Sequence, residues 1–167
     1  MSLVPNNGIH VVIDIDGVVY DPHAHPKGPY ADAAPALARM KELKISFSFL
    51  THGSRNFQHA KLRQCGVDCQ KTDVLVVPDF RDKRLDLKFL LTCLELESSP
   101  KRLIVVGDRP DIEIAFGGEL GCTTIRIVRG KHGALDDHTE HKPHYRLDDL
   151  RALPFILEEI RKELCPV

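Results

Sequence analysis

The chain has 167 residues, of which 43% are hydrophobic and 28% are charged, and its formal net charge is −1. This length suits one domain with a hydrophobic core and leaves no room for a second large one, so we expect a single core domain over residues 1–167. The small net charge gives no electrostatic reason to expect nucleic acid or an anionic membrane as a partner. Any attraction for phosphate must therefore be local.

Two further features bear on where the chain works. No apolar stretch reaches membrane-spanning length, and residues 1–7, M-S-L-V-P-N-N, lack the charged and apolar regions of a signal peptide. The five cysteines are an odd number without C-x-x-C spacing, which favours reduced thiols over a disulfide framework or a zinc site. We therefore expect a cytoplasmic protein without a membrane partner.

Strands and helices are predicted to alternate along the chain. In order, the predicted elements are a strand over 11–15, a helix over 33–43, a strand over 45–50, a helix over 55–65, a strand over 74–77, a helix over 85–96, a strand over 103–106, a helix over 112–120, a strand over 123–128 and a helix over 153–164. Gly66 and Gly121 stand where helices should end, and Ser54 stands where one should begin. This alternation favours an α/β fold with a doubly wound, Rossmann-like parallel sheet and helices on both faces. The least regular stretches are residues 21–32 and 130–144.

The first predicted strand ends in two carboxylates. The run V-V-I-D-I-D-G-V-V-Y-D places Asp14 and Asp16 where Gly17 lets the chain turn away. Ligands of open α/β sheets bind beyond the carboxyl ends of the strands, and side chains two residues apart in an extended chain point to the same side. One carboxylate is then placed to attack while the other transfers a proton, with a divalent cation between them and a phosphate. Taken alone, the same residues are also those of a strand that ends in an acidic turn.

Polar residues accompany three further strands. Thr51, in L-T-H-G-S-R, follows the second strand and offers a hydroxyl to a phosphate oxygen. Before the third helix, D-F-R-D-K-R contains Lys83 and Arg84, either of which supplies a fixed positive charge. The fourth strand ends in I-V-V-G-D-R-P-D-I-E, which contains Asp108 and Glu113. We expect these groups to meet at one rim of the sheet.

With these motifs the sequence resembles the haloacid dehalogenase-like superfamily, whose members are mostly phosphatases and phosphotransferases on a doubly wound sheet. The resemblance runs over residues 9–153, where D-I-D-G-V, T-H-G-S, Lys83 and G-D-R-P-D-I-E match the four motifs. It implies that Asp14 is a nucleophile that forms an aspartyl-phosphate. It also implies that Asp16 is the general acid for the leaving oxygen and then the general base for water.

The resemblance implies a binding set as well. Magnesium would be held by Asp14, the backbone carbonyl of Asp16 and Asp108, while Thr51 and Lys83 would bind the phosphoryl group. Magnesium prefers oxygen ligands, and three acids in one site need a cation and a lysine to offset their charge. Lys83 is preferred to Arg84 because Phe89 falls where relatives often place an aromatic residue.

Two positions depart from the pattern of the family. His52 stands where many relatives have Asn, so we include it among the phosphate-binding candidates, and Glu113 stands where G-D-R-x-x-x-D has Asp. Either change is expected to alter substrate contacts or the support of the metal site, and neither removes a required group. His138, His141 and His144 lie in a polar stretch with a proline, which favours a solvated loop over a transition-metal site.

The specificity cap that many relatives insert between these motifs is missing. Residues 16–51 and 51–83 each have room only for the core elements. The resemblance therefore implies a capless member with an open site, covered by residues 21–32 or by a partner subunit, and favours a homo-oligomer or a large substrate.

We therefore expect a magnesium-dependent phosphatase that acts on a phosphomonoester, either a small molecule or a larger phosphorylated substrate. Four alternatives stay open. A dehalogenase or a phosphotransferase would use the same nucleophile, although a dehalogenase needs neither Asp16 as proton shuttle nor a metal acid. A receiver domain should carry its phosphorylated Asp at the end of the third strand, which here reads V-L-V-V-P. A catalytically idle binding protein of this fold would not need intact motifs.

Overall fold

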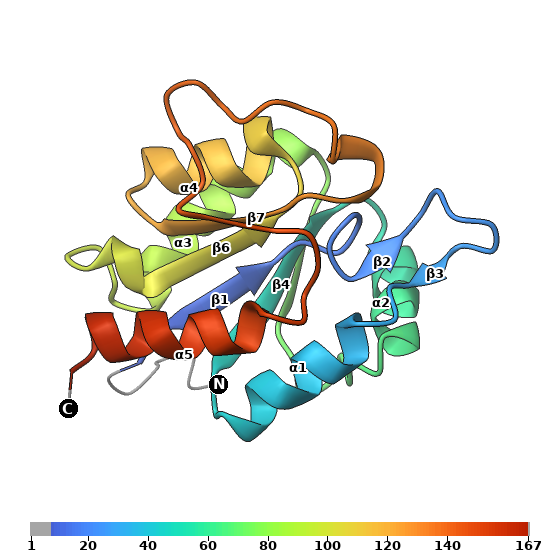
Figure 1. The fold of residues 1–167 in the computed structure, drawn as a ribbon, viewed down its shortest axis with the longest axis horizontal. Coiled ribbons are helices and arrows are strands. Elements are labelled where there is room, and N and C mark those ends of the chain that lie inside the picture. The colour runs from blue at the N-terminus through green and yellow to red at the C-terminus, as the bar shows by residue number, and fades with distance from the viewer. Residues whose placement is uncertain (1–7, 167) are drawn as a thin grey trace.

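The computed structural model describes residues 8–166 and contains a six-stranded sheet in which every neighbouring pair of strands is parallel (Figure 1). The strands are β1 (His10–Ile13), β4 (Ser46–His52), β5 (Val74–Val77), β6 (Leu103–Gly107), β7 (Thr123–Ile127) and β8 (Tyr145–Leu147). Their order across the sheet is β5-β4-β1-β6-β7-β8. The chain thus runs outward from β1 to β5, returns to β6 beside β1 and continues to β8. This confirms the predicted doubly wound parallel fold.

In the described part of the chain, five α-helices cover the two faces of the sheet (Figure 1). They are α1 (Ala33–Glu42), α2 (Arg55–Gln64), α3 (Lys83–Cys93), α4 (Ala115–Glu119) and α5 (Leu153–Leu164). The side chains of β1 alternate between two hydrophobic clusters. Val11 and Ile13 pack in the cluster that contains residues of α1, α2 and α5, whereas Val12 packs in the cluster with α3. Burial of β1 on both faces explains why its residues 11–13 form an apolar run.

The predicted helix ends agree with the backbone. Gly66 and Gly121, just beyond α2 and α4, have φ angles of +77° and +76°, which glycine adopts without strain. Ser54 is the N-cap of α2, although its side chain forms no capping hydrogen bond. The helix predicted over 112–120 differs. It begins as a π-helical turn over Pro110–Ile114, and α4 spans five residues that include Gly117 and Gly118. Glycine favours the helix weakly, which accounts for the short α4.

Three strands were not predicted. Strands β2 (Tyr20–Asp21) and β3 (Gly28–Pro29) form a two-stranded antiparallel hairpin within the irregular stretch after β1. Strand β8 adds a parallel edge beside β7. Two- and three-residue strands are too short to show a period in the sequence, so only the neighbouring strand reveals them. In Figure 1 the hairpin projects beyond the end of the sheet on the side of α2.

Within residues 8–166, no helix combines the length and apolar character needed to cross a bilayer. All five cysteines are free thiols in the structure. The expectation that residues 1–7 are not a signal peptide concerns a segment outside the described residues.

A buried histidine joins β1 to β4. His10 is 2% exposed, and its ring nitrogens lie 2.8 Å from Ser46 Oγ and 2.9 Å from Ser48 Oγ. Burial lowers the pKa of His10 to about 4, so the ring is neutral in the folded protein at neutral pH.

The free energy of unfolding should fall as the pH falls from about 6.5 to about 4. Above pH 6.5 the ring is neutral in both states, but below it the unfolded chain takes up a proton that folded His10 takes up only near pH 4. That difference corresponds to about 3 kcal/mol. Urea unfolding from pH 7 to pH 4 should show a shallower fall for His10→Asn than for the wild type. The exposed His25→Asn serves as the control, and an unchanged slope in His10→Asn would contradict this account.

Candidate active site

The candidate site residues gather at the carboxyl ends of the central strands. Asp14 directly follows β1 and donates its backbone N–H to the carbonyl of Val106 in β6, at 3.0 Å. Asp108 directly follows β6, the strand beside β1. Thr51 and His52 end β4, and Lys83 begins α3. The strand order reverses between β1 and β6, which is where open α/β sheets bind their ligands.

A buried lysine connects two of the acids. Lys83 Nζ lies 3.0 Å from Asp14 Oδ1 and 2.6 Å from Glu113 Oε1, and its side chain is 2% exposed. Arg84, the other candidate for the third motif, instead pairs with Glu119 at the surface. The geometry therefore favours Lys83 as the cation of the site.

Three buried carboxylates, two of which contact this lysine, lie close together. Asp14, Asp108 and Glu113 each offer an oxygen, and these oxygens lie within 4.8 Å of one another. One ammonium group leaves the three carboxylates with excess negative charge in a buried site. A hard divalent cation that prefers oxygen ligands fits this donor set.

Burial and the close approach of the carboxylates shift the pKa values of the groups in the site. Burial, and then the charge of Asp108, raise the pKa of Asp14 against the opposing effect of Lys83. Burial and the charge of Glu113 raise the pKa of Asp108 to about 7. Burial alone would lower the pKa of Lys83, but Asp14 and Glu113 outweigh it and raise that pKa above its ordinary value. The lysine thus stays charged, and the acids need a further positive charge to be ionised together.

One oxygen of Asp14 is left available. The backbone N–H of Ile15 donates to Asp14 Oδ1 at 2.8 Å, and Lys83 approaches the same oxygen. Asp14 Oδ2 accepts no hydrogen bond from the part of the chain that the structure describes. An oriented carboxylate with one unengaged oxygen is suited to act as a nucleophile or a metal ligand.

Gly17 lets the turn after β1 approach Asp108. Its φ angle is +76°, and a Cβ atom at this position would lie 2.2 Å from Asp108 Oδ2. A side chain there would displace the carboxylate. The glycine that follows Asp16 in the sequence is therefore a requirement of the site as well as of the turn.

Asp16 stands apart from the buried cluster. Its side chain is 33% exposed, and Lys61 Nζ donates to its two carboxylate oxygens at 2.7 and 2.8 Å. Lys61 was not among the predicted site residues. It lies on α2, where neighbouring basic residues such as Arg55 and Arg63 give its position no distinguishing signal.

Thr51 and His52 lie at the same edge of the sheet but form no side-chain hydrogen bond to the acids among the described residues. Thr51 is buried, in register with Val76 of β5. His52 is exposed and packs edge-on against Phe80, with ring centroids 6.0 Å apart. Burial and the charge of Lys83 lower the pKa of His52, which favours a neutral ring.

A second unpredicted contact comes from the histidine-rich stretch. His132 Nδ1 lies 2.7 Å from Asp108 Oδ2. His138 and His141 stack on each other with centroids 5.4 Å apart, and His144 Nδ1 accepts a hydrogen bond from the backbone N–H of Thr124. The path of the loop decides which histidine reaches the site, so residue type and spacing did not distinguish His132.

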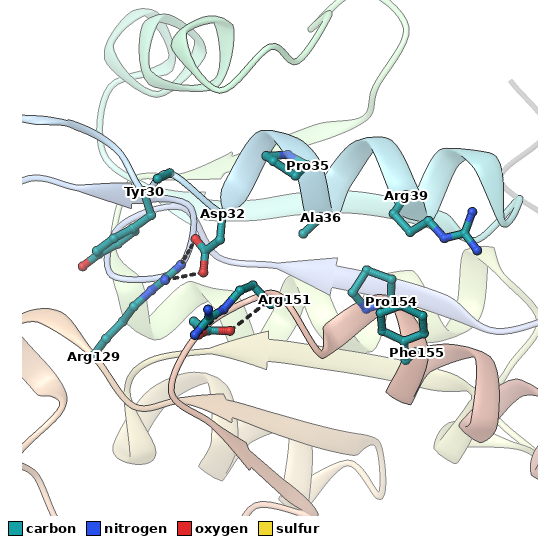
Figure 2. Close-up of a pocket in the computed structure, with 11 residues that line it drawn as sticks. Tyr30, Asp32, Pro35, Ala36, Arg39, Arg129, Arg151, Pro154 and Phe155 are labelled. Carbon is teal, nitrogen blue, oxygen red and sulfur yellow. Dashed lines mark hydrogen bonds and ion pairs between the residues drawn. The ribbon is translucent and has the colours of Figure 1, made fainter.

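Two cavities lie near this edge. A small one of about 30 Å³ is lined by the hairpin and by the site, through residues that include Asp16, Asp108, His23 and His132. Asp21, Pro22, His23 and Tyr30, from the stretch after β1, also line this cavity. A larger cavity of about 650 Å³ lies between α1 and the start of α5 (Figure 2). Arg129 and Asp32, which pair in this view, line this cavity, whereas Asp14, Asp108 and Glu113 do not.

Fold and site together define an α/β protein of Rossmann-like type with an acid and lysine centre at its switch point. Residues 86–153 match the model of the HAD-hydrolase-like family. The chain is 26% identical over 137 residues to a glyceraldehyde 3-phosphate phosphatase of Methanopyrus kandleri, a match that covers 81% of this chain and 59% of that protein. The chain therefore spans about three fifths of the length of this curated relative.

Two solved structures share the fold along almost their whole length. The D,D-heptose 1,7-bisphosphate phosphatase of B. bronchiseptica, described in complex with magnesium and phosphate, has a TM-score of 0.69 at 16% identity, over 90% of this chain and 98% of that chain. A hydrolase of Pseudomonas syringae has a TM-score of 0.68 at 14% identity, over 92% and 99%. The match of residues 86–153 to the HAD-hydrolase-like model agrees with the resemblance of the four motifs to the haloacid dehalogenase-like superfamily.

Replacing Lys83 should destabilise the fold far more than replacing its neighbour. Lys83→Met leaves Asp14 and Glu113 buried without a counter-charge, which should cost about 3–5 kcal/mol at neutral pH. Arg84→Met removes an exposed pair, worth at most about 1 kcal/mol. Urea unfolding of both variants measures the difference, and equal stabilities would show that the buried cluster is not held by Lys83.

Proposed function

We propose that the protein is a magnesium-dependent phosphatase that hydrolyses a phosphomonoester through an aspartyl-phosphate on Asp14. The observation that carries this proposal is that Lys83 and the N–H of Ile15 both approach Asp14 Oδ1, while Asp14 lies in a buried cluster with Asp108 at the switch point. The names of the relatives support the same activity, since the curated protein and the heptose bisphosphate enzyme are both phosphatases.

The donor set fits magnesium. Asp14, the backbone carbonyl of Asp16 and Asp108 would hold the ion, and Glu113 would stay with Lys83. When bound, magnesium supplies positive charge that offsets the acids and the phosphate oxygens. His132, through its contact with Asp108, would fix the orientation of one ligand.

The first half of the reaction moves the phosphoryl group to the protein. Asp14 Oδ2 forms a bond to phosphorus while the bond from phosphorus to the ester oxygen breaks. Asp16 gives its proton to that oxygen, which leaves as the alcohol. Lys83, at 3.0 Å from Asp14 Oδ1, and Thr51 and His52, at the end of β4, would bind the phosphoryl oxygens.

The second half returns the protein to its starting state. Asp16, now a carboxylate, accepts a proton from water as the water oxygen attacks phosphorus. The bond from phosphorus to Asp14 breaks, inorganic phosphate leaves, and Asp14 is again a carboxylate. The separation of the two carboxylates supports this division, because Asp14 is buried and oriented whereas Asp16 is one-third exposed.

The wider setting belongs to the same proposal. We infer one core domain over residues 1–167, a cytoplasmic location, and a homo-oligomer in which a second copy covers the open side of the site. The substrates suggested by the relatives are phosphorylated small molecules such as glyceraldehyde 3-phosphate or a heptose bisphosphate. The small cavity beside Asp16, of about 30 Å³, leaves room for little more than the group that reacts, so the rest of a substrate would lie outside it.

Removing the nucleophile should abolish turnover. Asp14→Asn keeps the volume of the side chain but loses the attacking charge, so kcat on p-nitrophenyl phosphate should fall by several orders of magnitude, on the order of 10⁴-fold or more. The wild type should lose activity with a chelator and regain it with magnesium. The control is Asp68→Asn, an exposed acid on the loop after α2. Hydrolysis by pure Asp14→Asn, or full wild-type activity with excess chelator, contradicts the assignment.

Removing the proton carrier should trap the intermediate. Asp16→Asn slows both halves, but an aryl phosphate needs less help from an acid, so its first half should be partly restored. Phosphate should then accumulate on Asp14, as an added mass of one phosphoryl group in intact-mass spectra after rapid quenching. Wild-type turnover by Asp16→Asn would exclude the acid and base role, and phosphoryl transfer to added alcohols would indicate a phosphotransferase instead.

A further inference from the structure

Asp16 is held by a residue that lies outside the four motifs. Lys61 Nζ donates to both of its carboxylate oxygens, at 2.7 and 2.8 Å, across 45 positions of sequence. Among the described residues, no other side chain hydrogen-bonds to Asp16. The orientation of this carboxylate therefore depends on one ammonium group.

Lys61 is itself fixed by its surroundings. The residues that flank it on α2 are anchored, since Leu62 is fully buried and Gln58 donates to the carbonyl of His52 at 2.9 Å. Its ammonium lies 5.5 Å from the centroid of the Tyr20 ring, at the base of the hairpin, and its side chain is only 16% exposed. A lysine with this little freedom can hold a partner in one geometry.

Asp14 and Asp16 differ in what holds them. The side chain of Asp14 is 8% exposed and is oriented by the N–H of Ile15 and by Lys83. That of Asp16 is 33% exposed and sits just before the turn at Gly17. Without Lys61, nothing described in the structure would keep the Asp16 carboxylate in a single rotamer.

We infer that Lys61 is the positioning residue for Asp16. It holds the carboxyl group where a proton can pass to the leaving oxygen and later from the attacking water, and so acts on both halves of the reaction through Asp16. The inference rests on the proposed function. Helix α2 then has a role in the chemistry. Its Gln58 contacts His52 at the end of β4, and its Lys61 contacts Asp16.

Two other roles for Lys61 make different predictions. A lysine that only attracts anionic substrates would affect KM and leave kcat unchanged. A lysine that only stabilises the fold would lower the melting temperature and reduce turnover of every ester by the same factor. A positioning residue should lower kcat most where proton transfer matters most, and should do so with little change in KM.

The test compares Lys61→Met, Lys61→Arg and the control Lys71→Met in the full chain. Lys71 is 84% exposed and lies 3.6 Å from Asp68, so the control also removes a lysine beside an aspartate. The substrates are an alkyl ester, glycerol 3-phosphate, and an aryl ester, p-nitrophenyl phosphate. We expect kcat of Lys61→Met on the alkyl ester to fall by about 10- to 100-fold, the loss typical of a misplaced group.

Further readouts separate the roles. With the aryl ester the loss should be smaller, and quenched Lys61→Met should carry phosphate on Asp14. Lys61→Arg, whose fork can also contact two carboxylate oxygens, should recover part of the alkyl activity. In a crystal structure of Lys61→Met, the Asp16 side chain should occupy more than one rotamer.

Other outcomes overturn the inference. A raised KM with unchanged kcat, an equal loss on both esters that follows the melting temperature, or an unmoved Asp16 in the crystal structure of Lys61→Met would each do so. Failure of the proposed function looks different. A wild type inactive on every ester, or an active Asp14→Asn, removes the phosphatase assignment and the inference with it.

Discussion

The structure depends on one buried ammonium group. Lys83 begins α3 and contacts Asp14, which follows β1, and Glu113, which lies in the π-helical turn after β6. Burying two carboxylates without a counter-charge costs several kcal/mol, so the lysine between them stabilises the packing of these three segments. The same contact orients Asp14. The contact of Lys83 with Asp14 therefore contributes both to the stability of the fold and to the orientation of the candidate nucleophile.

Most of the sheet could be predicted because burial on both faces leaves a clear pattern. The strand at 103–107 is a continuous apolar run that is buried throughout, and the helix over Leu153–Leu164 was predicted at its observed bounds. The hairpin and β8 were missed because their two or three residues form strands only through a neighbour. The π-helical turn over Pro110–Ile114 was not predicted either, because one extra residue in a turn leaves no clear period in so short a segment.

The candidate site was predictable to the extent that it follows strand ends. Asp14 and Asp108 come directly after two strands, and the strand order brings them together. The choice between Lys83 and Arg84 depended on which side chain points into the site. Adjacent residues of a helix point in different directions, and Lys83 contacts Asp14 whereas Arg84 pairs with Glu119 at the surface. Lys61 and His132 were not predicted, for a related reason. Each reaches its acid from a segment whose path is set by tertiary packing, so neither their type nor their spacing distinguishes them.

The wide spacing of the acids along the chain has a consequence for folding. Strand β1 pairs with β4 and β6, and β6 emerges from the ribosome only after residue 107 has been synthesised. Until then an apolar strand lacks one of its neighbours, and the loops that must close are long, which slows the formation of parallel sheets. Glu113 follows later still, so Lys83 contacts both of its carboxylate partners only when two thirds of the chain is in place. The nascent chain is thus most prone to aggregation while β1 is paired with β4 but not yet with β6. A chaperone would be most useful during that interval.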